Sequence, residues 1–330
     1  MAENSLIDWT DDTLNIWIGC NPVRFAVTLE QAKGLEQAGA TVVVKHINNH
    51  AMYFLPSECD NCYADVWSRR RFEKAQGLPR LWGNPKTTPR HETGDWRSKL
   101  KRFNRLAQDG GRRLCFAQSL SDIGEEHAMV KPWRDEFLPL ASEANYIDFL
   151  MLTKRPQNML RMVPAEWLQN WPQNVWLGYS AGTDRSIEIR AHYATEWRSL
   201  GVPVVFVSVE PQLEDLDIGT AIDAGANWII TGGESGNGEE RKRIDADADW
   251  FRRVRDTCLE DGVAYFHKQS GGSRPGTGKE LDGRLWHQWP DTEIGRVGGV
   301  RIAQGSELIR RTVNSGADIV TLKQSNGSSL

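Results

Sequence analysis

Short apolar runs recur along most of the chain, and each is followed by polar residues and then by a stretch with helical periodicity. From residue 113 onward these runs begin about 23 to 36 residues apart and are rich in β-branched and aromatic residues. Runs of this kind are typical of strands buried on both faces of a parallel sheet. They are TLNIWIG at 13–19, RLCFAQ at 113–118, IDFLMLT at 147–153, NVWLGYS at 174–180, PVVFVSV at 203–209, NWIITGG at 227–233 and VAYFHK at 263–268.

Seven such strands in series predict an α/β fold, namely a full or partial parallel β/α barrel, with an open doubly wound sheet as the alternative. Residues 21–58 interrupt the pattern with a helix-like piece, TLEQAKGLEQAG, and a strand-like piece, TVVVKH. We therefore predict a barrel over residues 1–290 with an insertion at 21–58. A C-terminal extension over 291–330 has one possible helix at SELIRRTV, and we expect its final SNGSSL to be disordered.

Polar residues follow the predicted strands at their carboxyl ends, where β/α barrels build their active sites. The candidates are Ser119, Asp122, Lys154, Ser180, Glu210, Gly232, Gly233, Glu234 and Lys268. The cation of Lys154 is suited to a carboxylate or phosphate group, and Lys268 should point towards the mouth of the barrel. An ion pair of Lys268 with Glu210 or Glu234 is the alternative.

Three cysteines form the most informative motif. Cys59 and Cys62 have C-x2-C spacing in ECDNCYA, and Cys20 ends a strand-like run. Three thiolates leave one site of an iron–sulfur cluster open to a substrate, whereas a structural zinc site needs four protein ligands. Zinc remains an alternative because His46 and His50 precede the pair. The 38 residues between Cys20 and Cys59 do not forbid convergence, since each doubling of a loop costs only ~0.6 kcal/mol.

A basic segment at 67–113 contains fourteen Lys or Arg residues and four Asp or Glu residues, although the chain as a whole has a net charge of −4. Aromatic residues are interleaved with these charges, a pattern that suits a phosphate backbone and stacked bases. A solvated helix face is the alternative. The candidates for nucleic-acid contact are Arg69, Arg70, Arg71, Trp82 and Trp96.

Composition excludes several classes of protein. No apolar run approaches the ~18 residues of a membrane span. The acidic N-terminus, MAENSLIDWTDD, lacks the pattern of a secretion signal, so we expect a cytoplasmic protein. Five cysteines in 330 residues do not make a disulfide framework. Cys115 and Cys258 are expected to be buried, inert thiols.

The motifs taken in order resemble a family of phage-encoded proteins related to radical S-adenosylmethionine enzymes, which would place this chain in the host cytoplasm. The resemblance covers roughly residues 7–62 and 112–290, apart from the insertion. It is carried by IDWTDDTLNIWIGC, CDNCYA, SLSDIGEEH, MLTKRPQNM, NVWLGYS, FVSVEP, WIITGGESG, FHKQSGG and LDGRLWHQWP.

The resemblance implies a β/α barrel, a [4Fe-4S] cluster, S-adenosylmethionine and an external electron donor. Cys20, Cys59 and Cys62 would hold the cluster, and reductive cleavage of the cofactor would release a 5′-deoxyadenosyl radical. The cofactor site would comprise Ser119, Asp122, Ser180, Glu210, Gly232, Gly233 and Glu234, and Lys154 and Lys268 would be catalytic.

The function that we expect is rearrangement or modification of a nucleic-acid base, in DNA rather than RNA, as part of phage DNA hypermodification. One alternative within the same class is a lyase that repairs a damaged base. An alternative from another class is a non-catalytic, zinc-stabilised nucleic-acid-binding module.

Overall fold

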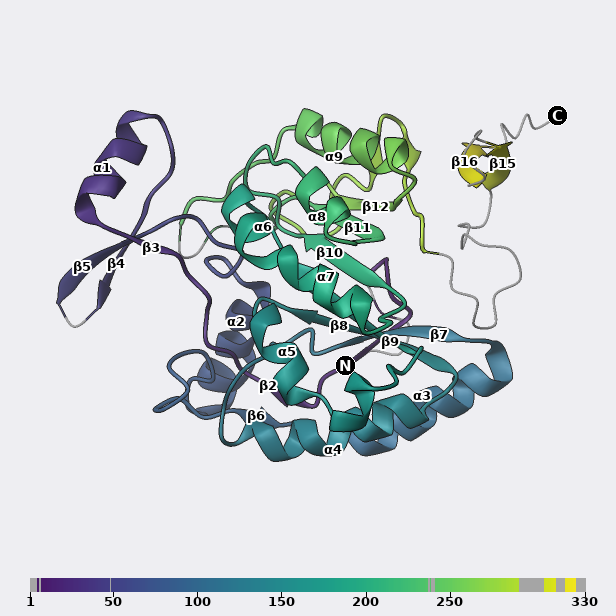
Figure 1. The fold of residues 1–330 in the computed structure, drawn as a ribbon. Coiled ribbons are helices and arrows are strands. Elements are labelled where there is room, and N and C mark those ends of the chain that lie inside the picture. Colours follow the sequence, from purple (N-terminus) through teal and green to yellow (C-terminus); the bar gives the residue numbers. More distant parts are fainter. Residues whose placement is uncertain are drawn as a thin grey trace.

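A sheet of seven parallel strands forms the centre of the computed structural model (Figure 1). The structure describes residue 5, residues 7–290 except Asn48, Asn237, Glu239 and Glu240, and the two segments 306–312 and 318–324. The strands of the sheet lie in the order β1 (Asp12–Leu14), β7 (Arg113–Ala117), β8 (Ile147–Thr153), β9 (Val175–Ser180), β10 (Val205–Val209), β11 (Trp228–Gly232) and β12 (Ala264–Gln269).

The order of the strands settles the fold class. An open doubly wound sheet reverses its strand order at a switch point, whereas this sheet follows the chain from β1 to β12 without reversal. Among the described strands β1 and β12 are the two edges, and the sheet curves into half of a barrel. The predicted partial β/α barrel is therefore confirmed, and the doubly wound alternative is wrong.

The predicted strands from residue 113 onward are confirmed, and β8 has the bounds that the sequence predicts. The prediction of one strand over 13–19 is wrong, because the chain leaves the sheet at Asn15. The side chain of Asn15 accepts a hydrogen bond from Leu120 N at 2.7 Å, so it is engaged by the loop after β7. The second half of the run becomes β2 (Trp17–Ile18), which pairs antiparallel with β6 (His91–Glu92).

Helices connect successive strands and pack on the outer face of the sheet (Figure 1). Alternate strand residues such as Phe149 and Met151 point into this outer layer and are fully buried. The helices are α3 (Trp96–Gly110), α4 (Val130–Glu143), α5 (Pro156–Met162), α6 (Asp184–Arg190), α7 (His192–Ser199), α8 (Gly219–Asp223) and α9 (Ala248–Glu260), with a short 3₁₀ turn at Ala165–Leu168.

The remaining strand residues fill the inner, concave face with aromatic rings. Trp176 and Trp228 meet edge to face, with ring centroids 6.2 Å apart. Gly178 makes room for the ring of Phe206, because a Cβ atom at position 178 would lie 2.4 Å from it. Trp9 contacts Phe116 in the same layer, with ring centroids 4.7 Å apart. These rings close the barrel interior below the carboxyl ends of the strands, and the space above them forms the site described below.

Residues 21–58 fold as an arm that projects from the barrel (Figure 1). The arm contains β3 (Ala26–Val27), α1 (Leu29–Gln37), β4 (Val43–Ile47) and β5 (His50–Phe54), and its sheet has the order β3–β5–β4. The predicted helix and strand are confirmed, and Thr28 caps α1 with a capping box. The stems of the arm are joined by a hydrogen bond from Ser57 Oγ to Val23 O at 2.7 Å.

The chain after the barrel differs from the prediction. After the hairpin of β13 (Glu280–Leu281) and β14 (Arg284–Leu285), the segment SELIRRTV contains the strand β15 (Ser306–Thr312) rather than a helix. That strand pairs antiparallel with β16 (Asp318–Gln324). The prediction for SNGSSL lies outside the described residues. Among the residues that the structure describes, no helix is both long and apolar enough to cross a membrane.

Candidate functional site

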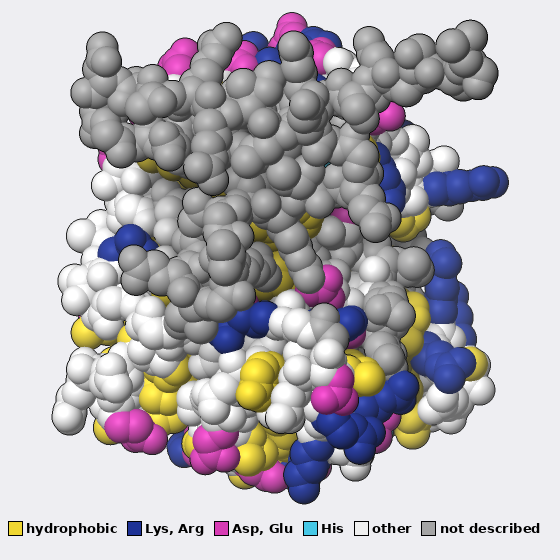
Figure 2. All heavy atoms as spheres, turned by 90° about the vertical axis from the view of Figure 1, so that its right-hand side faces the viewer, with side chains coloured by type: hydrophobic (Ala, Val, Ile, Leu, Met, Phe, Trp, Pro, Cys, Tyr) yellow, Lys and Arg dark blue, Asp and Glu magenta, His cyan; other side chains and the backbone are white. Residues whose placement is uncertain are grey.

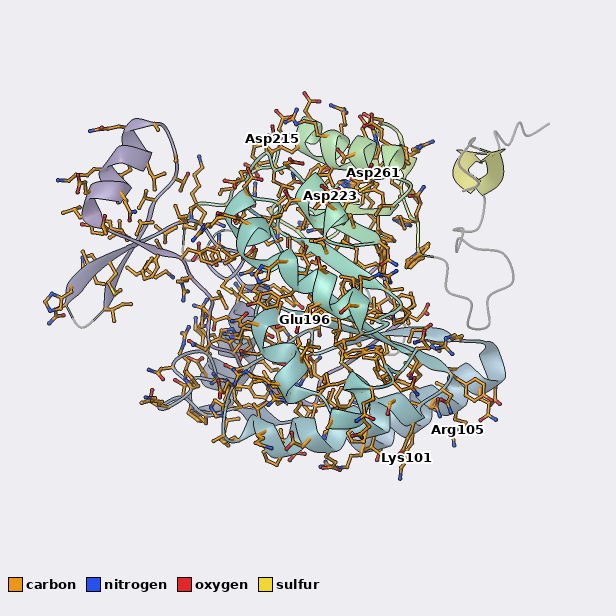
Figure 3. All side chains as sticks on the ribbon, in the orientation of Figure 1. Lys101, Arg105, Glu196, Asp215, Asp223 and Asp261 are labelled. Atoms are coloured by element: carbon orange, nitrogen blue, oxygen red, sulfur yellow. The ribbon has the colours of Figure 1, made fainter. Side chains whose placement is uncertain are left out.

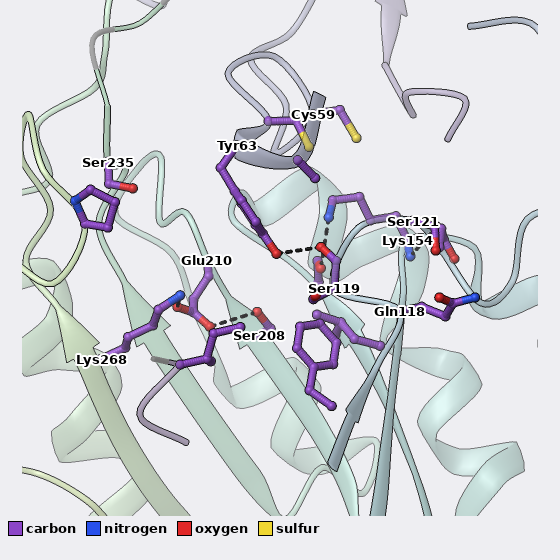
Figure 4. Close-up of a pocket in the computed structure, with 18 of the residues that line it drawn as sticks. Cys59, Tyr63, Gln118, Ser119, Ser121, Lys154, Ser208, Glu210, Ser235 and Lys268 are labelled. Atoms are coloured by element: carbon purple, nitrogen blue, oxygen red, sulfur yellow. Dashed lines mark hydrogen bonds and ion pairs between the residues drawn. The ribbon is translucent and has the colours of Figure 1, made fainter. Parts of the chain in front are cut away.

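A cavity of about 330 Å³ lies at the carboxyl ends of the strands, within the size range of small-molecule sites (Figure 4). Its walls are formed by residues that follow β7, β8, β9, β10 and β12, by the loop that carries Cys59, and by the segment around Trp9. The sequence candidates that line it are Cys20, Cys59, Cys62, Trp82, Ser119, Asp122, Lys154, Ser180, Glu210 and Lys268.

All three predicted cluster cysteines line this cavity as free thiols. Cys20 follows β2 and forms a backbone bridge with Trp82, while Cys62 immediately precedes the helix α2 (Tyr63–Ser68). The sulfur of Cys59 accepts a hydrogen bond from Val23 N at 3.4 Å, so a stem of the arm contacts the cysteine loop directly. The 38-residue insertion therefore folds outward and leaves the three thiols facing one space.

The chemistry of these thiols fits a group that binds thiolates. Burial raises the pKa of Cys20 and the pKa of Cys62, so a positive group that binds them must displace protons. Arg155 Nη1 lies 3.8 Å from the sulfur of Cys20 and favours its thiolate form. In the described part of the chain, no group of three or more His, Cys, Asp or Glu side chains is arranged to hold a metal ion. His46 and His50 are exposed on the β4–β5 hairpin, outside the cavity wall.

Asp122 organises the loops next to Cys20. Its carboxylate accepts hydrogen bonds from Arg155 Nη1 at 2.5 Å, Thr153 Oγ1 at 2.5 Å and the backbone N–H groups of Gly124 and Lys154 at 2.9 and 3.1 Å. Burial alone would raise the pKa of Asp122, but Arg155 and these donors hold it below its usual range. The carboxylate is saturated by protein groups, so its contribution to a ligand site is to position Arg155.

Lys154 lies in the cavity wall directly after β8. Its Nζ donates a hydrogen bond to Ser180 Oγ at 3.2 Å. Within the described residues, it forms no ion pair with a carboxylate, in contrast to Arg155. Glu58 and Asp122 lie near enough to raise the pKa of Lys154, and binding of a ligand carboxylate or phosphate by Lys154 stays a prediction.

Glu210 and Lys268 form the opposite wall of the cavity (Figure 4). Lys268 Nζ lies 2.7 Å from Glu210 Oε1, so the predicted alternative of an ion pair between these two residues is confirmed. Glu210 Oε2 accepts hydrogen bonds from Trp9 Nε1 at 3.2 Å and Ser208 Oγ at 3.3 Å. This wall therefore carries both charges and connects the aromatic layer of the barrel with the cavity.

The Gly-Gly-Glu segment after β11 has a packing role in the structure. Gly233 is required by the close approach of Ser270 O, which would lie 2.0 Å from a Cβ atom at that position. Gly232 faces Glu210 in the same way, at 2.8 Å. Both carboxylate oxygens of Glu234 bind Arg241, at 2.8 and 2.9 Å. The three residues stand outside the cavity wall, so the geometry does not support the prediction that they bind a cofactor.

The basic segment is only partly at the surface. Arg69, Arg70 and Arg71 lie on a π-helical turn (Arg69–Lys74) directly after α2, and Arg70 and Arg71 are exposed. Trp96 is fully buried against Phe137, so the prediction that it stacks on bases is wrong. Trp82 is also buried, although it lines the cavity. Aromatic residues at helical spacing in a basic helix equally predict side chains that pack into the core. In α3, Trp96 and Phe103 pack in this way.

Sequence reasoning missed Gln118 and Tyr63. Gln118 is buried in the cavity wall with a backbone φ of 72°, and its Nε2 has no hydrogen-bond partner among the described residues. A left-handed conformation at a residue other than glycine is uncommon and clusters at functional sites, but it has no sequence signature. Tyr63 lines the cavity and is 55% exposed. Its position next to Cys62 was a signal that could have identified it.

Acidification should weaken the fold through His267, a buried residue of β12. Burial lowers the pKa of His267 to about 4, whereas an unfolded histidine has a pKa near ~6.5. The unfolded chain therefore takes up the proton first, and stability is lost as the pH falls from about 6.5 towards 4, by up to ~1.4 kcal/mol per pH unit. Urea unfolding at several pH values measures this slope. His267→Gln should reduce it, and an unchanged slope would contradict the assignment.

The chain is similar to a family of proteins and to one curated protein. The family model described as "Protein of unknown function (DUF5131)" matches residues 55–290, which include Cys59, Cys62 and the strands β7 to β12. A protein of Xylella fastidiosa (strain 9a5c) described as "Putative replication protein" is 27% identical over 135 residues. That match covers 39% of this chain and 46% of the relative, so the chain spans less than half the length of the relative.

Proposed function

The chain belongs to the DUF5131 family, and we propose that it is a radical S-adenosylmethionine enzyme that modifies a base of a nucleic acid. In this proposal Cys20, Cys59 and Cys62 hold a [4Fe-4S] cluster, and S-adenosylmethionine occupies the adjoining cavity. When bound, the two groups supply one-electron chemistry, for which an external electron donor is the further partner. The protein supplies position and excludes water.

One observation carries the proposal. Two sequence segments that are 38 residues apart deliver three free cysteine thiols to one cavity at the carboxyl ends of a parallel β/α half-barrel. A [4Fe-4S] cluster takes one thiolate at each iron, so its ligands lie further apart than the ligands of a single ion. Three cysteines leave one iron for the cofactor. The zinc-stabilised alternative is weaker, because His46 and His50 are exposed on the arm while Cys59 and Cys62 line the cavity.

The residues around the thiols suit a zwitterionic cofactor. Lys154 offers a cation to a carboxylate. The amide N–H of Gln118, which has no partner among the described residues, offers a neutral donor. The ion pair of Lys268 and Glu210 gives the opposite wall a donor and an acceptor for the base that is to be modified. Both members of this pair line the cavity. A base that binds there therefore forms hydrogen bonds with Lys268 and Glu210 in place of the ion pair between them.

The nucleic-acid part of the proposal rests on charge. The exposed Arg70 and Arg71 follow α2, which begins at the cavity wall, so positive charge lies close to the site. Figure 3 shows Lys101 and Arg105 projecting from α3, and the exposed acids Asp215, Asp223 and Asp261 near α8 and α9 on the other side of the molecule. Phosphate groups should therefore approach the half that holds the basic segment. The description of the Xylella relative as a putative replication protein agrees with a nucleic-acid substrate. We propose DNA rather than RNA.

The test is anaerobic reconstitution with iron and sulfide, followed by addition of S-adenosylmethionine and a reductant. We expect about four irons per chain and the brown visible absorbance of an iron–sulfur cluster. Calorimetry should detect binding of the cofactor before any reductant is added. Mass spectrometry should then detect 5′-deoxyadenosine only in the reduced sample. A protein that takes up zinc but no iron, or a cluster that binds no cofactor, would overturn the proposal. Analysis of the product base distinguishes a modifying enzyme from a repair lyase.

A further inference from the structure

Two exposed aromatic rings lie on α2, and the first of them, Tyr63, lines the cavity. Tyr63 and Trp67 are four residues apart on α2, so they lie on the same face of the helix. Tyr63 is 55% exposed and Trp67 is 41% exposed. The hydroxyl of Tyr63 donates a hydrogen bond to Ser119 O at 2.5 Å, and Tyr63 and Ser119 both line the cavity (Figure 4). This bond fixes the Tyr63 ring against the rim of the cavity.

Exposure of this kind is unusual within the molecule. In the described part of the chain the exposed aromatic side chains are Tyr63, Trp67 and Tyr146, although the sequence has fourteen tryptophans. Trp67 and Phe72 meet edge to face, with ring centroids 5.6 Å apart and planes at 79°. That contact fixes the orientation of the indole and leaves part of it in solvent. Large apolar surfaces that stay exposed beside a pocket mark a place where another molecule binds.

The charges next to the two rings identify the kind of molecule. The π-helical turn that continues α2 presents Arg70, Arg71 and Lys74 to solvent. Neither Arg71 nor Lys74 forms an ion pair with any of the described residues, so both can bind an anion from outside. Figure 2 shows that Lys and Arg side chains also gather at the lower right of another face of the molecule, so positive charge alone does not define the site. Exposed rings beside unpaired cations form the combination that binds single-stranded nucleic acid.

We propose that Trp67 and Tyr63 form the stacking platform for an unpaired nucleotide, whose phosphates contact Arg71 and Lys74. The inference rests on the proposed function, because it treats the neighbouring cavity as the place where the base reacts. A base within a duplex has both faces stacked and cannot cover the indole. The substrate is therefore a single strand or a base that has left its duplex, held at the rim of the cavity before it enters.

The first test measures the affinity of the reconstituted full-length protein for a fluorescent single-stranded oligonucleotide by anisotropy. Trp67→Leu keeps an apolar side chain against Phe72 but removes the stacking face, and it should weaken binding by about 5- to 150-fold. Trp67→Phe keeps a ring and should retain most of the affinity. Tyr146→Leu is the control. It removes an exposed ring at the amino end of β8, at the other end of the strands from the cavity, and should leave the affinity unchanged.

The second test separates the two basic surfaces by their salt dependence. Replacing Arg71 and Lys74 by Gln should reduce the slope of log K against log salt by about 1.4, because two phosphate contacts are lost and each contributes about 0.7 for a single strand. The same exchange at Lys101 and Arg105, which are exposed on α3, serves as the matched control and should leave the slope unchanged.

The outcomes distinguish failure of the platform from failure of the proposed function. If Trp67→Leu binds single strands as tightly as the wild type, or if the α3 pair alone changes the slope, the platform is wrong even when 5′-deoxyadenosine is still formed. If the wild type forms 5′-deoxyadenosine but binds neither DNA nor RNA, the platform and the polymer substrate are both wrong. If single strands bind through Trp67 but the protein takes up no iron, the platform stands and the proposed chemistry fails.

Discussion

Replacing Cys20, Cys59 or Cys62 by alanine should abolish the iron–sulfur cluster, whereas Cys115→Ala and Cys258→Ala should keep it. Each of the first three thiols lines the cavity, and a cluster that has lost one of three protein ligands is exposed to solvent and decays. Cys115 is fully buried in β7, and Cys258 is fully buried in α9. Iron and sulfide analysis after anaerobic reconstitution measures the loss, and circular dichroism shows whether the fold is kept.

The same series decides between the cluster and zinc. If Cys20→Ala kept a full complement of metal while His46→Ala or His50→Ala lost it, the ligands would be those of the zinc alternative. Cys20 is the informative position, because Cys59 and Cys62 belong to both sets. Arg155 contacts both the sulfur of Cys20 and Asp122, so Arg155→Met is a useful companion variant. It should retain the cluster but weaken it, since the thiolate of Cys20 would lose its nearby positive charge.

The sequence predicts the barrel well because apolar runs, which buried strands require, recur along the chain. The strands β7 to β12 are largely buried on both faces, so they need mainly apolar residues, and each of them has a run in which apolar residues predominate. The first strand was misjudged because its run is equally apolar but is divided by Asn15, whose side chain binds Leu120 N. A single polar residue that ends a strand through a hydrogen bond 105 positions away leaves no periodic signal.

The site was predictable in position but not in detail. The carboxyl ends of parallel strands must meet at one edge of the sheet, which brings together Ser119, Lys154, Ser180 and Glu210. Which of the charges there is neutralised depends on side-chain pairing between distant segments. Glu234 is bound by Arg241, and Asp122 is bound by Arg155, so neither carboxylate is available in the way that its strand-end position suggests. The left-handed backbone of Gln118 has no counterpart in the sequence at all.

Glu125 and Glu126 are neighbours in the sequence. We expect a large loss of stability when Glu125 is changed to glutamine and almost none when Glu126 is. Glu125 is 1% exposed and pairs at 2.7 Å with Arg90, whose side chain is fully buried. Arg90 also donates hydrogen bonds to the carbonyl oxygens of Leu81 and Gly83, at 3.0 and 3.1 Å, so it fastens the loop that carries Trp82. Glu126 is 71% exposed, and its partner Arg161 is 52% exposed.

Glu125→Gln should lower the free energy of unfolding by about 3–5 kcal/mol, because it leaves the Arg90 guanidinium buried without a counter-charge. Glu126→Gln should leave the urea midpoint nearly unchanged, since an exposed ion pair competes with water. Glu125 Oε1 also accepts a hydrogen bond from Asn21 N at 2.7 Å, next to Cys20. The first variant should therefore also lose iron faster to a chelator at a urea concentration where it is still folded. Equal midpoints for the two variants would mean that the Arg90 pair does not hold the cysteine loop in place.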